Sequence, residues 1–173
     1  MSLSLYEVTV PSLLGALTSL KATLEKGAAH ADANKLDANA LLYARLYPDM
    51  LTFTRQIQVA CDSARRGSDR LVGREPSSVE DNEKTFAELI ARVDATMDHI
   101  KALERTAVDE SQDRSFNVPI GSMSLDFTGR SYVLGYMVPN VLFHVTTAYD
   151  ILRHNGVVLG KRDYLGPFVA GQM

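Results

Sequence analysis

The sequence has little cysteine, no tryptophan and no excess of positive charge. Its single cysteine, Cys61, excludes an intramolecular disulfide, and we expect the thiol to act as a small apolar group within a helix. The net charge of −3 argues against a nucleic-acid partner, because proteins that bind nucleic acid usually present a basic face. Four arginines cluster near the end of one predicted helix, where we interpret them as solvated cations: Arg65, Arg66, Arg70 and Arg74. A cytoplasmic location is the simplest prediction.

The sequence also lacks a recognisable membrane segment. Its longest uncharged stretch, residues 131–149, contains Pro139, Asn140, His144 and two threonines, so we interpret it as a buried helix. The N-terminus has no basic region and reaches an acid at Glu7, which is not typical of a signal peptide. We therefore expect no membrane partner.

Short catalytic and metal-binding motifs are missing too. There is no His-Glu-x-x-His, no Cys-x-x-Cys and no Ser-His-Asp arrangement. Three of the four histidines, His30, His99 and His154, fall at helix ends or on polar faces, and we expect them to face solvent. The sequence thus predicts no reaction, and whether the protein is an enzyme stays open.

What the sequence does have is helical periodicity. Hydrophobic residues make up 46% of the chain and charged residues 23%, which is typical of a globular protein, and we predict a single domain over residues 1–173. Apolar residues recur every three or four positions in four segments, which predicts an all-α four-helix bundle. The expected helices cover residues 4–30, 40–74, 78–105 and 128–155.

Two shorter segments complete the predicted fold. Residues 116–127 alternate apolar and polar side chains around a Gly-Ser turn, which predicts a small β-hairpin between the third and fourth helices. Residues 157–173 are rich enough in apolar side chains that we expect this tail to dock on the bundle.

Local signals suggest where the helices begin and how their outer faces are arranged. Pro48 fits the first position of the longer helix in the second segment. Ser77 or Ser78 has the spacing of a capping box at the start of the third. Glu88 and Arg92 have the spacing of a solvated ion pair on its outer face.

The fourth predicted helix carries the candidate site. Pro139 removes one amide donor and clashes with the carbonyl of Gly135, so we expect a kink of the kind that often borders a cavity. His144 lies on the inner side of the same helix, and a buried imidazole needs a hydrogen-bond partner. Two interpretations stay open: a hydrogen-bonded core histidine, or a ligand or base in a cavity between helices.

Candidate partners come from the second predicted helix. Asp49 and Gln56 are seven residues apart, so on one helix they would project from nearly the same face. If that face meets Asn140 and His144, the four side chains form a polar pocket that Tyr149 could line. In the alternative interpretation, Asp49 is a first-turn acid and Gln56 a surface amide.

The sequence also resembles a known family. The resemblance is carried by YPDM at 47–50, RQIQ at 55–58, PNVLFHVTTAYDILR at 139–153 and GVVLGKRDYLG at 156–166. These segments resemble a domain-of-unknown-function family of small bacterial and fungal proteins related to the DinB/YfiT-like four-helix bundles. The resemblance implies an up-down-up-down bundle that is commonly a homodimer.

In that superfamily, metal-binding members hold a divalent ion with three histidines, one from helix two and two from helix four at His-x-x-x-His spacing. Here His144 fits the first helix-four position, but Ala148 stands at the second. The second helical region offers Asp49 and no histidine. We therefore predict a degenerate metal site, with no bound metal and no cofactor.

Three functional hypotheses follow. The first is a small-molecule-binding module or metal-free enzyme that uses His144, Asn140, Asp49 and Gln56 in a pocket between helices. The second is a structural or interaction homodimer whose ancestral site has become part of the core. The third is a metal-dependent hydrolase or thiol transferase, activities that the resemblance to the superfamily brings with it.

Overall fold

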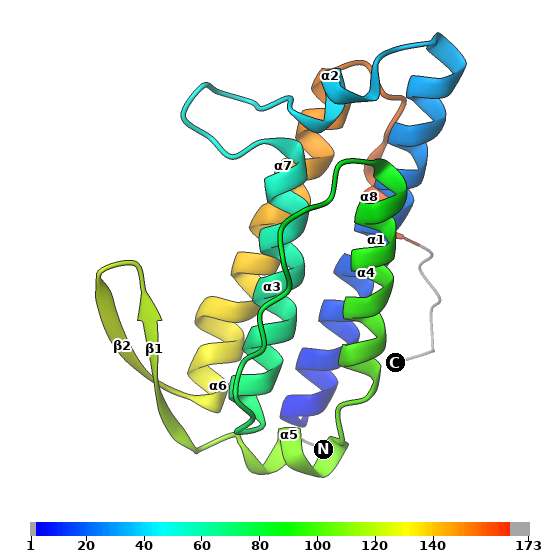
Figure 1. Cartoon of the computed structure of the whole chain (residues 1–173). Helices are drawn as coiled ribbons and strands as arrows, with labels where there is room; N and C mark the ends of the chain where they lie inside the picture. The colour runs from blue at the N-terminus through cyan, green and yellow to red at the C-terminus, as the bar shows by residue number, and fades with distance from the viewer. Residues whose placement is uncertain (1–2, 167–173) are drawn as a thin grey trace.

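The computed structural model describes residues 3–166 and shows the predicted mostly helical fold with a two-stranded antiparallel hairpin (Figure 1). Its helices are α1 (Leu5–Asn34), α2 (Ala38–Leu42), α3 (Phe53–Leu71), α4 (Phe86–Lys101), α5 (Arg105–Glu110), α6 (Gly129–Tyr132), α7 (Val138–His154) and α8 (Lys161–Leu165). A π-helical turn, η1 (Val133–Met137), joins α6 to α7, and the strands are β1 (Ser115–Ile120) and β2 (Met123–Thr128).

The hydrophobic core lies between four long helical elements. Helix α1 packs against α4 and α7, and α3 packs against the same two helices from the other side. The inner stripe of α1 is fully buried, as its spacing predicts: Leu13, Leu17, Leu20 and Leu24. Within residues 3–166, no helix combines the length and the apolarity needed to cross a membrane.

The second predicted segment contains a short helix, α2, and a longer one, α3, as expected, but the predicted start of the longer helix at Pro48 is wrong. Residues 43–52 form an irregular connection, and α3 begins at Phe53 rather than at Pro48. Thr52 caps α3, since its hydroxyl accepts a hydrogen bond from the Arg55 amide. Arg45 holds the connection from within by donating to the carbonyls of Pro48 and Met50, each at 3.1 Å. Proline permits a helix start but does not require one, and here threonine supplies the cap.

The third predicted helix also begins later than expected. Residues 74–85, which we call the strap, run without helix or strand, and α4 starts at Phe86. The capping box is formed by Thr85 and Glu88 instead of by Ser77 or Ser78. The Thr85 hydroxyl accepts from the Glu88 amide at 3.2 Å, and the Glu88 carboxylate accepts from the Thr85 amide at 2.9 Å.

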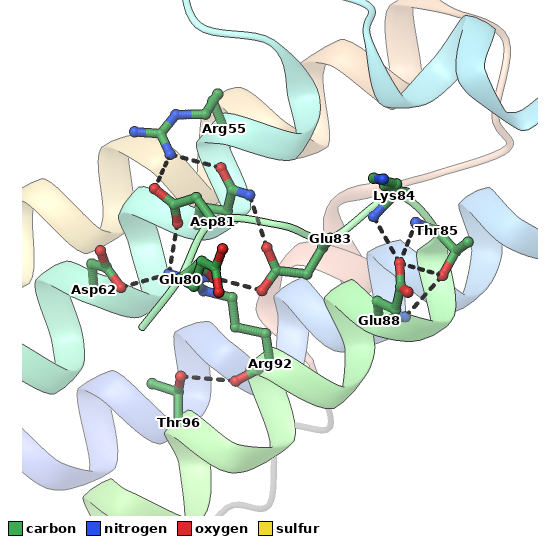
Figure 2. A network of polar contacts seen from close by, with 11 residues as sticks. Arg55, Asp62, Glu80, Asp81, Glu83, Lys84, Thr85, Glu88, Arg92 and Thr96 are labelled. Carbon is green, nitrogen blue, oxygen red and sulfur yellow. Dashed lines mark hydrogen bonds and ion pairs between the residues drawn. The ribbon is translucent and has the colours of Figure 1, made fainter. Parts of the chain in front are cut away.

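Arg92 of α4 fastens the strap, as Figure 2 shows. Its guanidinium donates to Glu83 at 2.8 Å and to Asp62 of α3 at 2.7 Å, and it lies 3.0 Å from Asp81. The Arg92 side chain is only 4% exposed. The predicted surface pair of Glu88 and Arg92 is therefore wrong, because the strap covers that face of α4 and supplies other acids.

The last long helical element is continuous from residue 129 to residue 154 and includes η1. The π-helical turn directly precedes Pro139 on α7. A wider turn at this place accommodates a residue that has no amide hydrogen and would crowd the carbonyl of Gly135. The expected irregularity is thus present, as a local widening of the helix.

The hairpin lies beside the α6 end of this element (Figure 1). Strands β1 and β2 pair in register from Ser115↔Thr128 to Ile120↔Met123, close to the predicted limits. After α7, Val157 and Leu159 are buried and α8 packs against α1, so the described part of the tail docks as expected. The remainder of the predicted tail, residues 167–173, lies outside the described residues.

Candidate functional site

The structure brings His144 of α7 and Gln56 of α3 into direct contact. The His144 Nδ1 atom lies 2.6 Å from Oε1 of Gln56, and both side chains are buried. The Gln56 amide also donates to the carbonyl of Leu51 at 3.3 Å, so the amide oxygen is the atom turned toward the imidazole. In that arrangement Nδ1 carries the hydrogen and donates it. Burial lowers the pKa of His144, which favours the neutral ring.

Asn140 lies one helical turn before His144 but has a different partner. Its amide donates to the Ser63 hydroxyl of α3 at 2.8 Å. Asn140 and Ser63 both line a cavity that His144 does not line. The polar contacts between α3 and α7 are therefore two separate pairs, one buried and one at a cavity wall.

The other two predicted site residues lie elsewhere. Asp49 is exposed in the connection 43–52 and does not share a helical face with Gln56, because that expectation required a helix starting at Pro48. Tyr149 lies against α8, where its ring meets Tyr164 edge to face at 5.9 Å. Five residues after His144, its side chain points to a different side of α7.

The three histidines expected to face solvent differ in their exposure. His154 is exposed, and His30 is partly exposed. His99, by contrast, lies 2.9 Å from Asp69, a carboxylate that is buried on α3. That expectation for His99 is wrong, because the helical pattern of α4 alone does not show that α3 places an acid opposite it.

The cavity beside Asn140 has a volume of about 340 Å³. One wall is α3, which contributes Arg55, Val59, Asp62, Ser63, Arg66 and Arg70. The facing walls come from β1, α6, η1 and α7, which contribute Val118, Pro119, Tyr132, Tyr136, Met137 and Asn140. A mixed lining of apolar, aromatic and convergent polar groups is typical of small-molecule sites.

Aromatic packing positions the wall opposite α3. The rings of Tyr132 and Tyr136 stack with their centroids 5.6 Å apart, and Phe127 of β2 packs edge to face on Tyr132 at 5.5 Å. These contacts fix the hairpin against α6 and η1. Beside the cavity, α3 approaches η1 closely because residue 67 is glycine: a Cβ there would overlap the Met137 sulfur.

The electrostatics of the cavity come mainly from α3. Arg66 and Arg70 both line it and are partly exposed, and Arg70 lies in the last turn of α3, where the sequence places the arginine cluster. Burial raises the pKa of Tyr132, and the positive charge of nearby Arg70 opposes that rise. The signal that sequence reasoning missed is the four-residue spacing of two arginines, which places them on one helical face.

Metal ligands do not gather at this site. Among residues 3–166, no three His, Cys, Asp or Glu side chains are placed so that they could hold a metal ion. His144 faces the amide of Gln56, and Ala148, one turn further along α7, is buried in the core. The groups present are suited to hydrogen bonding and to binding of charged groups.

Comparisons with known proteins agree with this fold. The model of the domain of unknown function DUF1993 matches residues 5–165. The crystal structure of a DinB family member from Shewanella denitrificans, at 1.83 Å resolution, is similar at 35% sequence identity with a TM-score of 0.84. The similarity covers 96% of this chain and 95% of that one. A comparison with curated proteins gives no match.

Proposed function

Because this chain belongs to the DUF1993 family and resembles a DinB family member in structure, we propose that it is a small-molecule-binding module whose site is the cavity between α3 and α7. The observation that carries the proposal is the cavity itself. Elements from distant parts of the sequence converge on it, and the polar atoms of Ser63 and Asn140 meet at its wall. Its volume of about 340 Å³ suits a small organic molecule.

The polar groups at the wall have hydrogen-bonding capacity to spare. The Ser63 oxygen accepts from the Asn140 amide, which leaves the Ser63 hydroxyl hydrogen free to donate to a ligand. The Asn140 carbonyl oxygen adds an acceptor. An adjacent donor and acceptor orient a bound ligand and also contribute affinity. His144 and Gln56 support the site from the neighbouring turn.

A fragment screen by NMR tests the proposal. We expect polar fragments to shift the amide signals of residues that line the cavity, and Ser63→Phe, which fills it, to abolish these shifts. His154→Phe places the same ring at an exposed position and serves as the matched control. The proposal fails if no fragment binds, or if fragments bind Ser63→Phe as they bind the parent protein.

We further propose that the Gln56–His144 pair is what remains of the superfamily's metal site. His144 occupies the first helix-four position of that pattern, and an amide rather than a histidine approaches it from α3. Elemental analysis after gentle purification tests this idea. A stoichiometric amount of zinc, nickel, iron or manganese would overturn it.

A second candidate function is self-association. The 129–154 element carries apolar side chains that are well exposed, above all Phe143 at 56% and Leu134 at 55%. Exposed apolar side chains of this size are found at protein interfaces, and a homodimer is the assembly that the resemblance implies. The up-down-up-down order of the long helices and a cytoplasmic location remain predictions from the sequence.

Light scattering after gel filtration tests the dimer. We expect the parent protein to be dimeric and Phe143→Glu to shift it to monomer. Val158→Glu introduces the same charge at another exposed apolar residue, outside this helical element, and should leave the assembly unchanged. A parent protein that is monomeric at all concentrations removes this candidate.

A further inference from the structure

The strongest unexplained feature of the molecule is a pair of arginines without acidic partners. Arg66 and Arg70 lie four residues apart on α3 and therefore on one face. Both line the cavity beside Asn140 and also an adjoining hollow of about 420 Å³ beneath the hairpin. Neither makes an ion pair with any acid among the described residues 3–166.

The other charged groups that line the cavity beside Asn140 are already engaged, whereas Glu75, which lines the adjoining hollow, makes no ion pair with either arginine. Arg55, at the far end of the cavity, contacts Asp81 of the strap. Asp62, the acid in the cavity wall, lies 2.7 Å from Arg92. Arg66 and Arg70 are both partly exposed, and neither has an acid of the described residues within ion-pair distance, in a protein whose net charge is negative.

Arg66 also has an unused donor. Its Nε atom is buried and has no hydrogen-bond acceptor within the described part of the chain. Buried donors in proteins are nearly always satisfied, so the hydrogen bonding of the Arg66 guanidinium within the described part of the chain is incomplete. A planar guanidinium suits a carboxylate or phosphate, because these groups accept two parallel hydrogen bonds.

We propose that Arg66 and Arg70 form an anion-binding subsite, and that the ligand is a small organic acid or phosphate ester. This inference rests on the proposed binding function and names the chemical class of its ligand. The anionic group binds the two guanidinium groups, and the body of the ligand lies along Tyr136 and Pro119. A polar end reaches the pair formed by Ser63 and Asn140.

Three ring compounds that differ in one group test the subsite: benzoate, phenyl phosphate and neutral benzamide. Binding is followed by NMR through the amide signals of the cavity and the side-chain Nε–H signals of arginine. We expect at least one anion to bind about ten times more tightly than benzamide, since hydrogen bonds to charged groups are the stronger ones. Preference for phenyl phosphate assigns a phosphate ester, and preference for benzoate assigns a carboxylic acid.

Substitutions then locate the binding. Arg66→Gln and Arg70→Gln should each weaken anion binding about tenfold or more while leaving benzamide unaffected. Arg66→Lys keeps the charge and should retain part of the affinity. Arg153→Gln removes an exposed arginine about 20 Å further along the same helical element than Asn140, and should change nothing. Thermal unfolding of each variant shows that it is folded, and with two separate glutamine variants one misfolded protein does not decide the result.

Two results would overturn the subsite. If benzamide binds in the cavity as tightly as either anion and both glutamine variants keep anion affinity, the ligand is not anionic, although the proposed binding function survives. If no compound causes a saturable shift up to about 10 mM, well above the range in which specific fragments bind, the anion subsite is rejected. The fragment screen described above then decides separately whether the cavity binds anything.

Discussion

At the scale of single residues, the contact between His144 and Gln56 defines how α3 meets α7. The helical period of the sequence predicts that His144 points inward, and it does. The period cannot identify the partner, because the facing of two helices depends on their packing. That is why Gln56, a plausible surface amide in the sequence, proves to be buried, whereas Asp49 is exposed because it lies in the connection 43–52 and not on a helix.

Removal of the imidazole should cost stability more than function. We expect His144→Ala to lower the free energy of unfolding by about 1–3 kcal/mol, because the buried amide oxygen of Gln56 loses its donor. Urea denaturation measures the change. His154→Ala, at an exposed position on the same helix, should stay within about 0.5 kcal/mol of the parent protein. Equal stability of both variants would contradict the role given to this hydrogen bond.

The same residue should make stability depend on pH. Burial lowers the pKa of His144 in the folded state, so the unfolded chain binds the proton more readily. Stability should therefore be full above the unfolded pKa of about 6.5 and fall as pH drops below it toward the folded pKa. His144→Gln cannot titrate and is the control. We expect the difference in unfolding free energy between parent and variant to shift against the parent on acidification; a constant difference would exclude this effect.

Replacement of glycine by alanine should have opposite effects on stability at Gly129 and at Gly15. A Cβ at Gly129 would overlap the backbone carbonyl oxygen of Ser111, which cannot move without the chain, whereas a Cβ at Gly15 meets nothing within 4 Å. Gly129→Ala should therefore destabilise the fold by about 2 kcal/mol or more, as overpacking does. Gly15→Ala should stabilise it by about 0.5–1 kcal/mol through helix propensity. Thermal unfolding of both variants checks the signs, and a stabilised Gly129→Ala would show that the close approach is not required.

At the scale of elements, the strap explains the largest error of the sequence reasoning. The period of α4 places Glu88 and Arg92 outside the core, which is correct as far as the helix alone is concerned. Residues 74–85 then cross that face without any secondary structure and turn Arg92 into a buried anchor. Helical periodicity cannot predict that another segment covers this face of α4, because the contacts of the strap join distant parts of the chain.

Breaking the anchor should release the strap. Arg92→Ala leaves Glu83, Asp62 and Asp81 without the cation that they share. We expect the free energy of unfolding to fall by about 2–3 kcal/mol. This is the lower range for a broken buried ion pair, because two of the acids are partly exposed. Amide hydrogen exchange of strap residues 77–85 should accelerate. Lys101→Ala removes an exposed pair with Asp98 and should cost no more than about 0.5 kcal/mol. Unchanged exchange in the strap would mean that its other contacts suffice to hold it.

At the scale of the whole molecule, the predictable and the unpredictable features separate by the range of their contacts. The mostly helical fold and the hairpin follow from local patterns, such as the leucine stripe of α1 and the Gly-Ser turn. The cavity does not, because it needs α3, β1 and η1 to meet, and because Gly67 must admit Met137. Arg66 and Arg70 therefore appear as solvated cations in the sequence and as cavity walls in the structure.

Cys61 offers a test of whether this core opens as one unit. Its thiol is buried on α3, and burial raises its pKa to about 12, so the folded protein should present almost no reactive thiolate. Reaction of the thiol with a disulfide reagent should then require global unfolding. The logarithm of the reaction rate should therefore rise with urea concentration with the slope that equilibrium unfolding gives. Cys61→Ser combined with Ser124→Cys moves the thiol to the exposed hairpin and should react at once. A rate in the parent protein that is independent of urea would show that α3 opens locally around Cys61, where it faces α4, while the rest of the helices stay packed.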